Sequence, residues 1–282
     1  MRVIAIACVL LFSAPFAYAE TLLERGTYLM KSVVACGNCH TPQTPKGPAA
    51  GMELAGQLVL KEKHFTAYAP NITSDKEHGI GSWTDEEIIT AIREGKRPDG
   101  SLIGPPMPFE TYKDISDRDA KAIVAYLRTV KPNPNKVPNS EYNIPLPPAW
   151  GPPIKSVREP DRNDQVKYGE YLVNALGHCT ACHSPLMKGA PDLEHQLGAG
   201  GQKIPGPWGV AVTSNITPHA DGISDYSDED IANAITKGVR PDGSKLSPPM
   251  GFWYYKNISP DDIKAIIAYL RQLEPKPSPK GG

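Results

Sequence analysis

The 282-residue sequence lacks an excess of either charge, since 30 Lys and Arg residues stand against 31 Asp and Glu residues. Proteins that bind nucleic acid use surplus Lys and Arg to neutralise phosphates. The balance therefore indicates no nucleic-acid partner. Proline and glycine, by contrast, are abundant, with 30 and 25 residues that fall between the periodic segments. This distribution predicts short helices joined by ordered loops rather than a disordered chain.

Long apolar runs are also lacking. A positively charged start precedes the apolar run Val3 to Phe12, which is too short to span a bilayer, and Ala17-Tyr18-Ala19 has the form of a cleavage site. We therefore predict a signal peptide over residues 1–19, cut after Ala19, and a periplasmic mature chain. Cys8 lies inside the apolar run with too little sequence before it for lipoprotein acylation. We expect at most peripheral membrane association.

Cysteine is scarce, with five residues, and the four that remain after removal of Cys8 fall in two copies of Cys-x-x-Cys-His. In this motif the thiols bind the vinyl groups of haem as thioethers, and the adjoining imidazole can bind the iron. A zinc site, a thioredoxin-like redox pair and a structural disulfide are the alternatives. Two copies that both end in His on an exported chain favour two covalent haem c groups. The predicted cofactor-binding residues are Cys36, Cys39, His40, Cys179, Cys182 and His183.

The sequence contains one module written twice. The two cysteine motifs, at 36 and 179, are 143 positions apart, and the same offset relates several downstream segments. These pairs are Arg97-Pro98-Asp99-Gly100-Ser101 with Arg240-Pro241-Asp242-Gly243-Ser244, Pro105-Pro106-Met107 with Pro248-Pro249-Met250, and Ala122 to Arg128 with Ala265 to Arg271. An offset held over so much chain indicates a duplicated domain with a period far longer than that of a solenoid.

A proline-rich segment separates the copies. Nine prolines lie between Lys131 and Pro160, with no helical or strand periodicity, which predicts an extended, semi-rigid linker that could also cross one domain as a strap. We therefore predict five parts along the chain. These are a signal peptide (1–19), a first domain (20–130), the linker (131–165), a second domain (166–274) and a flexible tail (275–282).

Within each copy the regular signals are helical. Thr84 and Ser227 begin capping-box patterns, and Ser116 and Ser259 resemble N-caps. Apolar residues then recur at i, i+3, i+4 and i+7 in the last segment of each copy, and no comparable strand alternation is evident. We therefore predict an all-α fold. The final apolar stripes are Ala120, Ile123, Val124 and Leu127, and Ile263, Ile266, Ile267 and Leu270.

Two methionines are candidates for the second axial ligand of each iron. A buried methionine is usually a core residue, but Met107 and Met250 are the only methionines that recur at the repeat offset. Both follow Pro-Pro, in loops that two fixed φ angles would stiffen. We therefore predict that His40 with Met107, and His183 with Met250, ligate the two irons.

Other residues are weaker candidates. Five histidines outside the motifs lack a counterpart in the other copy, and a lone loop histidine is more often hydrogen-bonded than metal-bound. They are His64, His78, His178, His195 and His219, of which His178 adjoins a motif cysteine. Three recurring pairs could surround haem or could serve turns and packing. They are Asn71 with Asn215, Trp83 with Tyr226, and Arg97 with Arg240.

A haem iron held between imidazole and thioether has no open position, which predicts electron transfer rather than catalysis. The order Cys-x-x-Cys-His, Asn-Ile-Thr, capped helix, Asp-Gly, Pro-Pro-Met and Ala-Tyr-Leu-Arg, seen in both copies, resembles the multi-haem cytochrome c subunits of bacterial membrane-bound alcohol, aldehyde and sugar-acid dehydrogenases. That resemblance implies tandem class I-like cytochrome c domains with His/Met ligation. It also implies electron transfer from a dehydrogenase towards a cytochrome or terminal oxidase of the respiratory chain. The alternative is a di-haem enzyme, either a peroxidase or a thiosulfate-type oxidoreductase.

Overall fold

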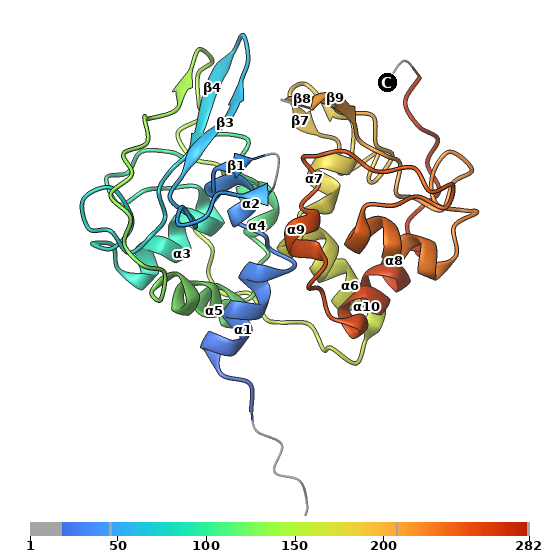
Figure 1. Cartoon of the computed structure of the whole chain (residues 1–282), viewed down its shortest axis with the longest axis horizontal. Helices are drawn as coiled ribbons and strands as arrows, with labels where there is room; N and C mark the ends of the chain where they lie inside the picture. Colours follow the sequence, from blue (N-terminus) through green and yellow to red (C-terminus); the bar gives the residue numbers. More distant parts are fainter. Residues whose placement is uncertain (1–18, 45–46, 207, 281–282) are drawn as a thin grey trace, which may run out of the picture.

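The protein is described here by a computed structural model that covers residues 19–44, 47–206 and 208–280. The predicted signal peptide, including Cys8, lies outside the described residues except for Ala19. The described chain forms two halves that lie side by side, the first in blue to green and the second in yellow to red (Figure 1). In the described residues, no helix has both the length and the apolar character needed to cross a membrane.

Each half begins and ends with a helix and carries short helices and strands between them. In the first half these elements are α1 (Leu22–Lys31), α2 (Gly37–His40), β1 (Gln43–Thr44), β2 (Gly47–Pro48), β3 (Gln57–Lys61), β4 (Phe65–Ala69), α3 (Asp85–Glu94), α4 (Phe109–Tyr112) and α5 (Asp117–Leu127). The linker adds β5 (Glu141–Tyr142).

The second half follows a similar order. Its elements are α6 (Gln165–Glu170), the π-helical turn η1 (Tyr171–Leu176), α7 (Cys179–His183), β6 (Leu186–Met187), β7 (Ala190–Pro191), β8 (Lys203–Gly206), β9 (Gly209–Val212), α8 (Asp228–Lys237), α9 (Phe252–Tyr255) and α10 (Pro260–Leu270). The helix pairs α2 and α7, α3 and α8, α4 and α9, and α5 and α10 each occupy equivalent places in the two halves.

The prediction of an all-α fold is wrong. Helices make up 31% and strands 12% of the chain, spread over several small sheets, so the fold is mixed α/β. The strands form after each cysteine motif, where β3 pairs with β4, β4 with β5, and β8 with β9, all antiparallel. Hairpins satisfy the backbone N–H and C=O groups of these long segments locally. Strands of two to five residues are too short to carry a clear alternating signal in the sequence.

The predicted helix starts are confirmed. The side chains of Thr84 and Ser227 accept hydrogen bonds from the backbone N–H groups of Glu87 and Asp230, and the acidic side chains accept in return from the cap N–H groups. Ser116 caps α5 in a similar way, and Ser259 caps α10. These caps satisfy N–H groups that have no partner within the helix.

The first and last helices of each half cross at a glycine. An added Cβ on Gly26 of α1 would lie 1.9 Å from the carbonyl oxygen of Ala122 in α5, and one on Gly169 of α6 would lie 1.9 Å from that of Ala265 in α10. Only glycine permits backbones to approach this closely. Both crossings lie beside the buried apolar stripes of α5 and α10, whose predicted members are all buried in the structure.

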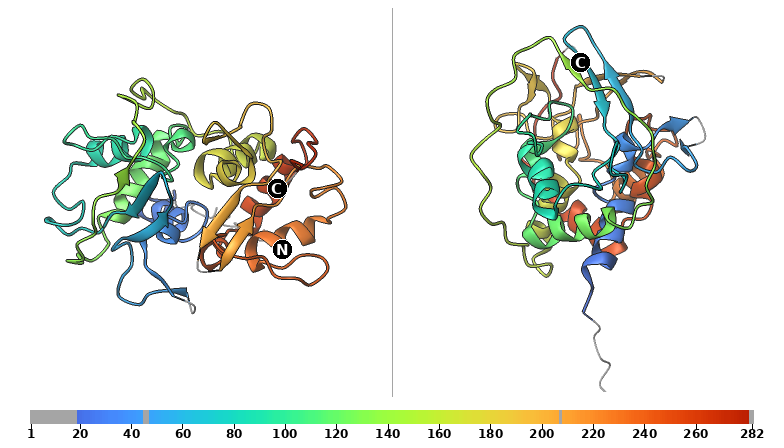
Figure 2. Two further views of the ribbon diagram at one scale, coloured as in Figure 1. Left: turned by 90° about the horizontal axis from the view of Figure 1, so that it is seen from above. Right: turned by 90° about the vertical axis from the view of Figure 1, so that its left-hand side faces the viewer.

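The linker lies across the first half. Asn133 and Asn135 accept hydrogen bonds from the side chain of Asn71 through their carbonyl oxygens. Further along, β5 extends the β3–β4 sheet, and Trp150 stacks on Phe109 with ring centroids 4.3 Å apart. In Figure 2, this green segment wraps the outside of the first half. We call residues 131–158 the strap.

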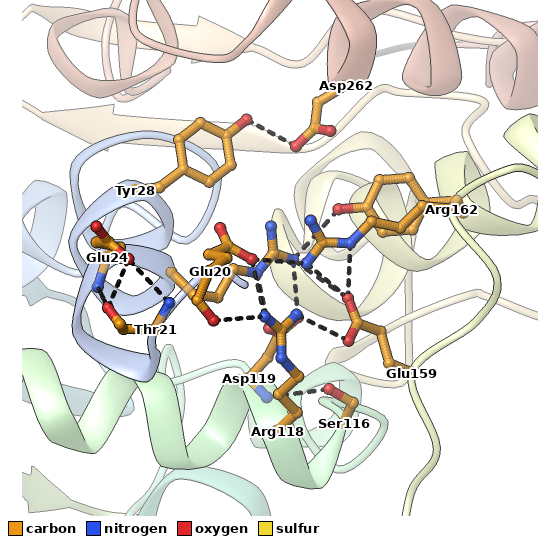
Figure 3. A network of polar contacts seen from close by, with 12 residues as sticks. Glu20, Thr21, Glu24, Tyr28, Ser116, Arg118, Asp119, Glu159, Arg162 and Asp262 are labelled. Atoms are coloured by element: carbon orange, nitrogen blue, oxygen red, sulfur yellow. Dashed lines mark hydrogen bonds and ion pairs between the residues drawn. The ribbon is translucent and has the colours of Figure 1, made fainter. Parts of the chain in front are cut away.

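Two tyrosines join the halves in a reciprocal manner. Tyr171 of η1 donates a hydrogen bond to Asp119 (2.8 Å) and accepts one from the N–H of Ser116 at the start of α5. Tyr28 of α1 likewise donates to Asp262 (2.6 Å) and accepts from the N–H of Ser259, at the start of α10. Figure 3 shows the contact between Tyr28 and Asp262. The first helix of each half is thus anchored on the last helix of the other.

The two ends of this interface differ in charge. Asp119 forms a buried ion pair with Arg25 (2.8 Å), whereas Tyr168 occupies the position equivalent to Arg25 in the second half. Asp262 therefore has no ion-pair partner within 4 Å among the described residues. Burial raises the pKa of Asp262, and this effect outweighs the lowering by its hydrogen bond from Tyr28 and by the charges of Arg25 and Arg162.

Adding a methyl group at either helix crossing should destabilise the protein. We expect Gly26→Ala and Gly169→Ala each to cost about 1–3 kcal/mol or more, because the added Cβ overlaps a backbone carbonyl that cannot move aside. Gly151→Ala is the control, since nothing lies within 4 Å of its Cβ position. Urea unfolding of the three variants measures the effect. Equal stability of all three would contradict the crossing geometry.

The charge asymmetry predicts different responses to removal of each carboxylate. Asp119→Asn should cost about 3–5 kcal/mol near pH 7, because it removes the carboxylate 2.8 Å from the buried Arg25 and leaves only Glu159, 3.9 Å away, as an ion-pair partner. Asp262→Asn should be neutral or stabilising there, because it removes a charge whose burial opposes folding and keeps an acceptor for Tyr28.

The pH dependence follows from the direction of the Asp262 shift. Its pKa in the folded state is above the unfolded value of about 3.9, so the folded protein holds this proton more tightly. The resulting stabilisation is complete below the unfolded pKa and is lost as the pH rises through the folded pKa. Unfolding free energies near pH 7 and pH 4 should therefore show the advantage of Asp262→Asn shrinking at low pH. A comparable loss for both variants near pH 7 would refute this assignment.

Candidate haem site

The two cysteine motifs form the single-turn helices α2 and α7. The residue before each motif, Ala35 or His178, has a left-handed backbone, with φ of 48° and 41° respectively. This conformation turns the chain sharply out of the preceding helical segment and into the motif. The four cysteines of the described residues are free thiols rather than disulfides.

Each motif histidine is held by one ring nitrogen. Nδ1 of His40 lies 2.8 Å from the carbonyl oxygen of Pro70, and Nδ1 of His183 lies 2.7 Å from that of Ser214. Because a carbonyl oxygen only accepts, Nδ1 carries the proton in both rings. Nε2 then presents a lone pair and makes no hydrogen bond to the described residues. Metal-binding histidines are usually oriented by such a hydrogen bond from the second nitrogen.

The Asn-Ile-Thr segment that follows each of these carbonyls is held by side-chain hydrogen bonds of its asparagine, and we call this asparagine the brace. Asn71 accepts hydrogen bonds from the N–H and hydroxyl of Thr73 and donates to the strap, as described above. In the second half, Asn215 accepts the same two bonds from Thr217 and donates to the carbonyl oxygen of Lys276. The bonds from Thr73 and Thr217 are the turn chemistry expected of asparagine, and both asparagines also line the cavity described below. The brace fixes the carbonyl that orients each histidine.

The four motif cysteines differ in exposure, since Cys39 is exposed and Cys36, Cys179 and Cys182 are half-buried. Burial raises the pKa of Cys36 and Cys179 to about 12 each. Desolvation by the surrounding chain, with a smaller contribution from Cys182, raises the pKa of Cys39 to about 11, although this residue is the most exposed of the four. Thiols with such pKa values are protonated at neutral pH, unlike the low-pKa thiolates of redox-active disulfide motifs.

The two Pro-Pro-Met loops have the same backbone form. Both X-Pro bonds, Pro105–Pro106 and Pro248–Pro249, are cis. The carbonyl oxygens of Met107 and Met250 accept hydrogen bonds from the N–H groups that begin α4 and α9. Both methionines are half-buried.

One continuous cavity of about 2190 Å³ joins these groups. Ligand pockets usually measure about 300–1,000 Å³, so this cavity has room for more than one large group. Its walls include isoleucine, leucine, valine and aromatic side chains from both halves, as an apolar porphyrin requires. All eight predicted site residues line it, namely Cys36, Cys39, His40, Met107, Cys179, Cys182, His183 and Met250.

Haem c needs thiols that can form thioethers, a histidine nitrogen that can bind iron, and an apolar cavity. The protonated thiols, the two Nε2 atoms without a hydrogen bond to the described residues, and the cavity fit these needs. The described residues hold no group of three His, Cys, Asp or Glu side chains placed to share one metal ion. Among the other histidines, His195 contacts Asp192, and His219 accepts a hydrogen bond from the N–H of Asp221. His178 packs edge-on against Tyr112, with ring centroids 5.6 Å apart. Burial lowers its pKa to about 4, so it is neutral at pH 7.

Comparisons with known proteins identify the class to which the two halves belong. Residues 21–127 match the family described as "Cytochrome C oxidase, cbb3-type, subunit III", and residues 166–274 match "Cytochrome c". The halves are therefore cytochrome c domains, and the protein is an electron-transfer haem protein with covalently bound haem c.

Relatives of known description extend this class assignment. A "Diheme cytochrome c-type" protein of Cereibacter sphaeroides is 30% identical over 84% of this chain and 81% of its own length. The chain belongs to this family of di-haem c-type cytochromes. The "Alcohol dehydrogenase (quinone), cytochrome c subunit" of Gluconobacter oxydans is 31% identical over 93% of the chain, and the "Fructose dehydrogenase cytochrome subunit" of Gluconobacter japonicus is 32% identical over 90%.

The resemblance to dehydrogenase cytochrome subunits noted in the sequence is thus confirmed. The chain spans only 56% of the length of the alcohol dehydrogenase relative and 53% of that of the fructose dehydrogenase relative.

The asparagine braces offer a test of how the histidines are held. Asn215→Ala should cost about 1–3 kcal/mol, because the buried N–H of Thr217 loses its acceptor and the carbonyl of Lys276 keeps only the hydroxyl of Thr217 as a donor. Asn71→Ala should have a similar effect. Asn163→Ala is the control, since the only side-chain hydrogen bond that Asn163 makes to the residues the structure describes is to exposed Asp161. Thermal unfolding of the three variants measures these effects. If Asn163→Ala were destabilised as much as the other two variants, the proposed role of the asparagines would be wrong.

Proposed function

We propose that the chain is a periplasmic electron carrier with two covalent haem c groups, which relays electrons from a dehydrogenase to a cytochrome or terminal oxidase. Cys36 and Cys39 would hold the first haem, with His40 and Met107 as axial ligands. The second would be held by Cys179 and Cys182, with His183 and Met250 as axial ligands. The observation that carries the proposal is the matched anchoring of His40 and His183 within one cavity that contains both motifs.

The predicted division of the chain is part of this proposal. The two cytochrome c domains span 20–130 and 166–274, joined by the linker 131–165 and flanked by the signal peptide 1–19 and the tail 275–282. Within that tail, the N–H of Ser278 donates to Asp221 and the carbonyl of Lys276 accepts from Asn215. An exported location follows from the predicted signal peptide.

Haem supplies an iron that gains and loses one electron at a time. The residues around it have three tasks. The hydrogen bonds from Nδ1 fix the imidazole rings of His40 and His183 that would bind the irons, Met107 and Met250 would supply the second ligands, and the apolar walls would exclude water. A site closed on both sides favours electron transfer over substrate binding. Because Asn38 of the first motif contacts Pro249, next to Met250 in the second half, the two sites lie against one interface and are suited to pass electrons between them.

A dehydrogenase as donor is supported by the descriptions of the relatives. The two Gluconobacter proteins are described as cytochrome subunits of an alcohol dehydrogenase and of a fructose dehydrogenase. This chain would accept electrons from a dehydrogenase in the same manner. The acceptor would be met through a small, transient interface, as is usual for redox partners.

The test is the optical spectrum of the oxidised protein in the near infrared, where methionine bound to ferric haem gives a weak charge-transfer band. We expect two haems per chain, and we expect Met107→Ala and Met250→Ala each to remove about half of the band, since each site would supply one thioether. Met187→Ala is the control, because Met187 is 48% exposed and has no counterpart in the first half.

The same experiment tests the alternative of a di-haem enzyme. If Met107→Ala or Met250→Ala left the band unchanged, that site would lack methionine ligation. A peroxidase or thiosulfate-type oxidoreductase with that haem as its centre would then replace the electron carrier.

A further inference from the structure

A side chain of the first cysteine motif reaches the methionine loop of the second half. Nδ2 of Asn38, the residue before Cys39, donates a hydrogen bond of 2.8 Å to the carbonyl oxygen of Pro249, which directly precedes Met250. Asn38 also packs against Gly251, the residue that follows Met250, since a Cβ added to Gly251 would lie 3.5 Å from Cγ of Asn38. The first haem-binding segment therefore touches both neighbours of Met250.

A second contact seats the same motif on α9. A Cβ added to Gly37 would lie 2.1 Å from the hydroxyl oxygen of Tyr254, so the absence of a side chain at Gly37 lets α2 lie directly on this ring. Tyr254 belongs to the short helix that begins two residues after Met250. Gly37 and Asn38 together join α2 to the segment that presents Met250.

The first methionine loop, which carries Met107, is held by side chains of the strap instead. The hydroxyl of Tyr142, in the strap, donates to the carbonyl oxygen of Pro105 (2.9 Å), and Nε1 of Trp150 donates to that of Ile103 (2.8 Å). Tyr142 also covers Gly104, where an added Cβ would lie 2.4 Å from its ring. The loop that carries Met107 is thus fixed by residues that follow it in its own half.

The second half has no equivalent of these strap contacts. Within the described ranges 19–44, 47–206 and 208–280, the side chain of Asn38 makes the only hydrogen bond to Ser247, Pro248 or Pro249. The second motif makes no equivalent hydrogen bond to the first methionine loop. The residue equivalent to Asn38 is Ala181, whose methyl group cannot donate. The two loops have the same sequence, Pro-Pro-Met, and unlike supports.

We propose that Asn38 is a positioning residue for Met250, so that the ligation of the second haem depends on the peptide that carries the first, whereas Tyr142 positions Met107 within its own half. This inference rests on the proposed His/Met ligation. The carbonyl of Pro249 belongs to the peptide bond that joins Pro249 to Met250. A hydrogen bond to this carbonyl therefore restricts where the Met250 thioether can lie. Without that bond, the loop gains freedom and the thioether is displaced more easily by another ligand.

The experiment measures that displacement with imidazole as the competing ligand. In the Met107→Ala background, only the Met250 band remains, and in the Met250→Ala background only the Met107 band remains. Asn38→Ala should increase the affinity of imidazole for the remaining site about fivefold in the first background, as expected for loss of one hydrogen bond. It should have no effect in the second background. Tyr142→Phe should show the reverse pattern.

Two features keep the outcomes distinct. Asn38→Ala copies the residue found at the equivalent position of the second motif, and Tyr142→Phe retains the ring, so both variants are expected to fold. If both methionine bands are present but Asn38→Ala changes neither affinity, or changes both equally, Asn38 does not position Met250 and the inference is overturned. If the wild type lacks the Met250 band, the proposed ligation fails and this inference fails with it.

Discussion

The reciprocal tyrosine contacts are the constraint on which the site depends. Tyr28 and Tyr171 each span the interface and satisfy both a carboxylate and the first free N–H of a helix in the other half. Since α1 and η1 lead directly into the cysteine motifs, anchoring them also fixes where α2 and α7 lie. Together with the contact of Asn38 with Pro249, these hydrogen bonds fix the separation of the two motifs. Electron transfer between the sites depends on that separation.

Much of the site could be predicted from the sequence because its signals are local. The cysteine motifs, the helix caps and the Pro-Pro-Met loops involve residues within five positions of one another, and duplication shows each signal twice. The contacts between the halves could not be predicted this way. Tyr28 and Tyr171 occupy positions on helices where an aromatic residue normally indicates core packing, and nothing in their spacing reveals that their hydroxyls cross to Asp262 and Asp119.

The strands were missed for a related reason. In β3 the exposed residues Leu58 and Lys61 are three positions apart, and β4 has no exposed residue, so neither strand has the strict alternation of exposed and buried residues that marks a half-buried strand. The pairing of β4 with β5 joins residues more than seventy positions apart. The role of Asn71 and Asn215 could have been inferred from Asn-x-Thr, since an asparagine side chain commonly accepts from a backbone N–H two residues on.

Duplication alone would produce two sites with equal properties, so the differences between the halves carry information. The strap covers only the first half, Arg25 places a buried charge beside Asp119 but not symmetrically beside Asp262, and Asn38 has no counterpart in Ala181. None of these three differences involves a proposed ligand, and all lie on surfaces where the halves meet each other or the linker. The two proposed ligand sets, which are identical, are thereby placed in unlike surroundings. Because hydrogen bonds, burial and nearby charge set a haem's reduction potential, a relay built from a duplicated domain acquires its asymmetry from these contacts rather than from its ligands.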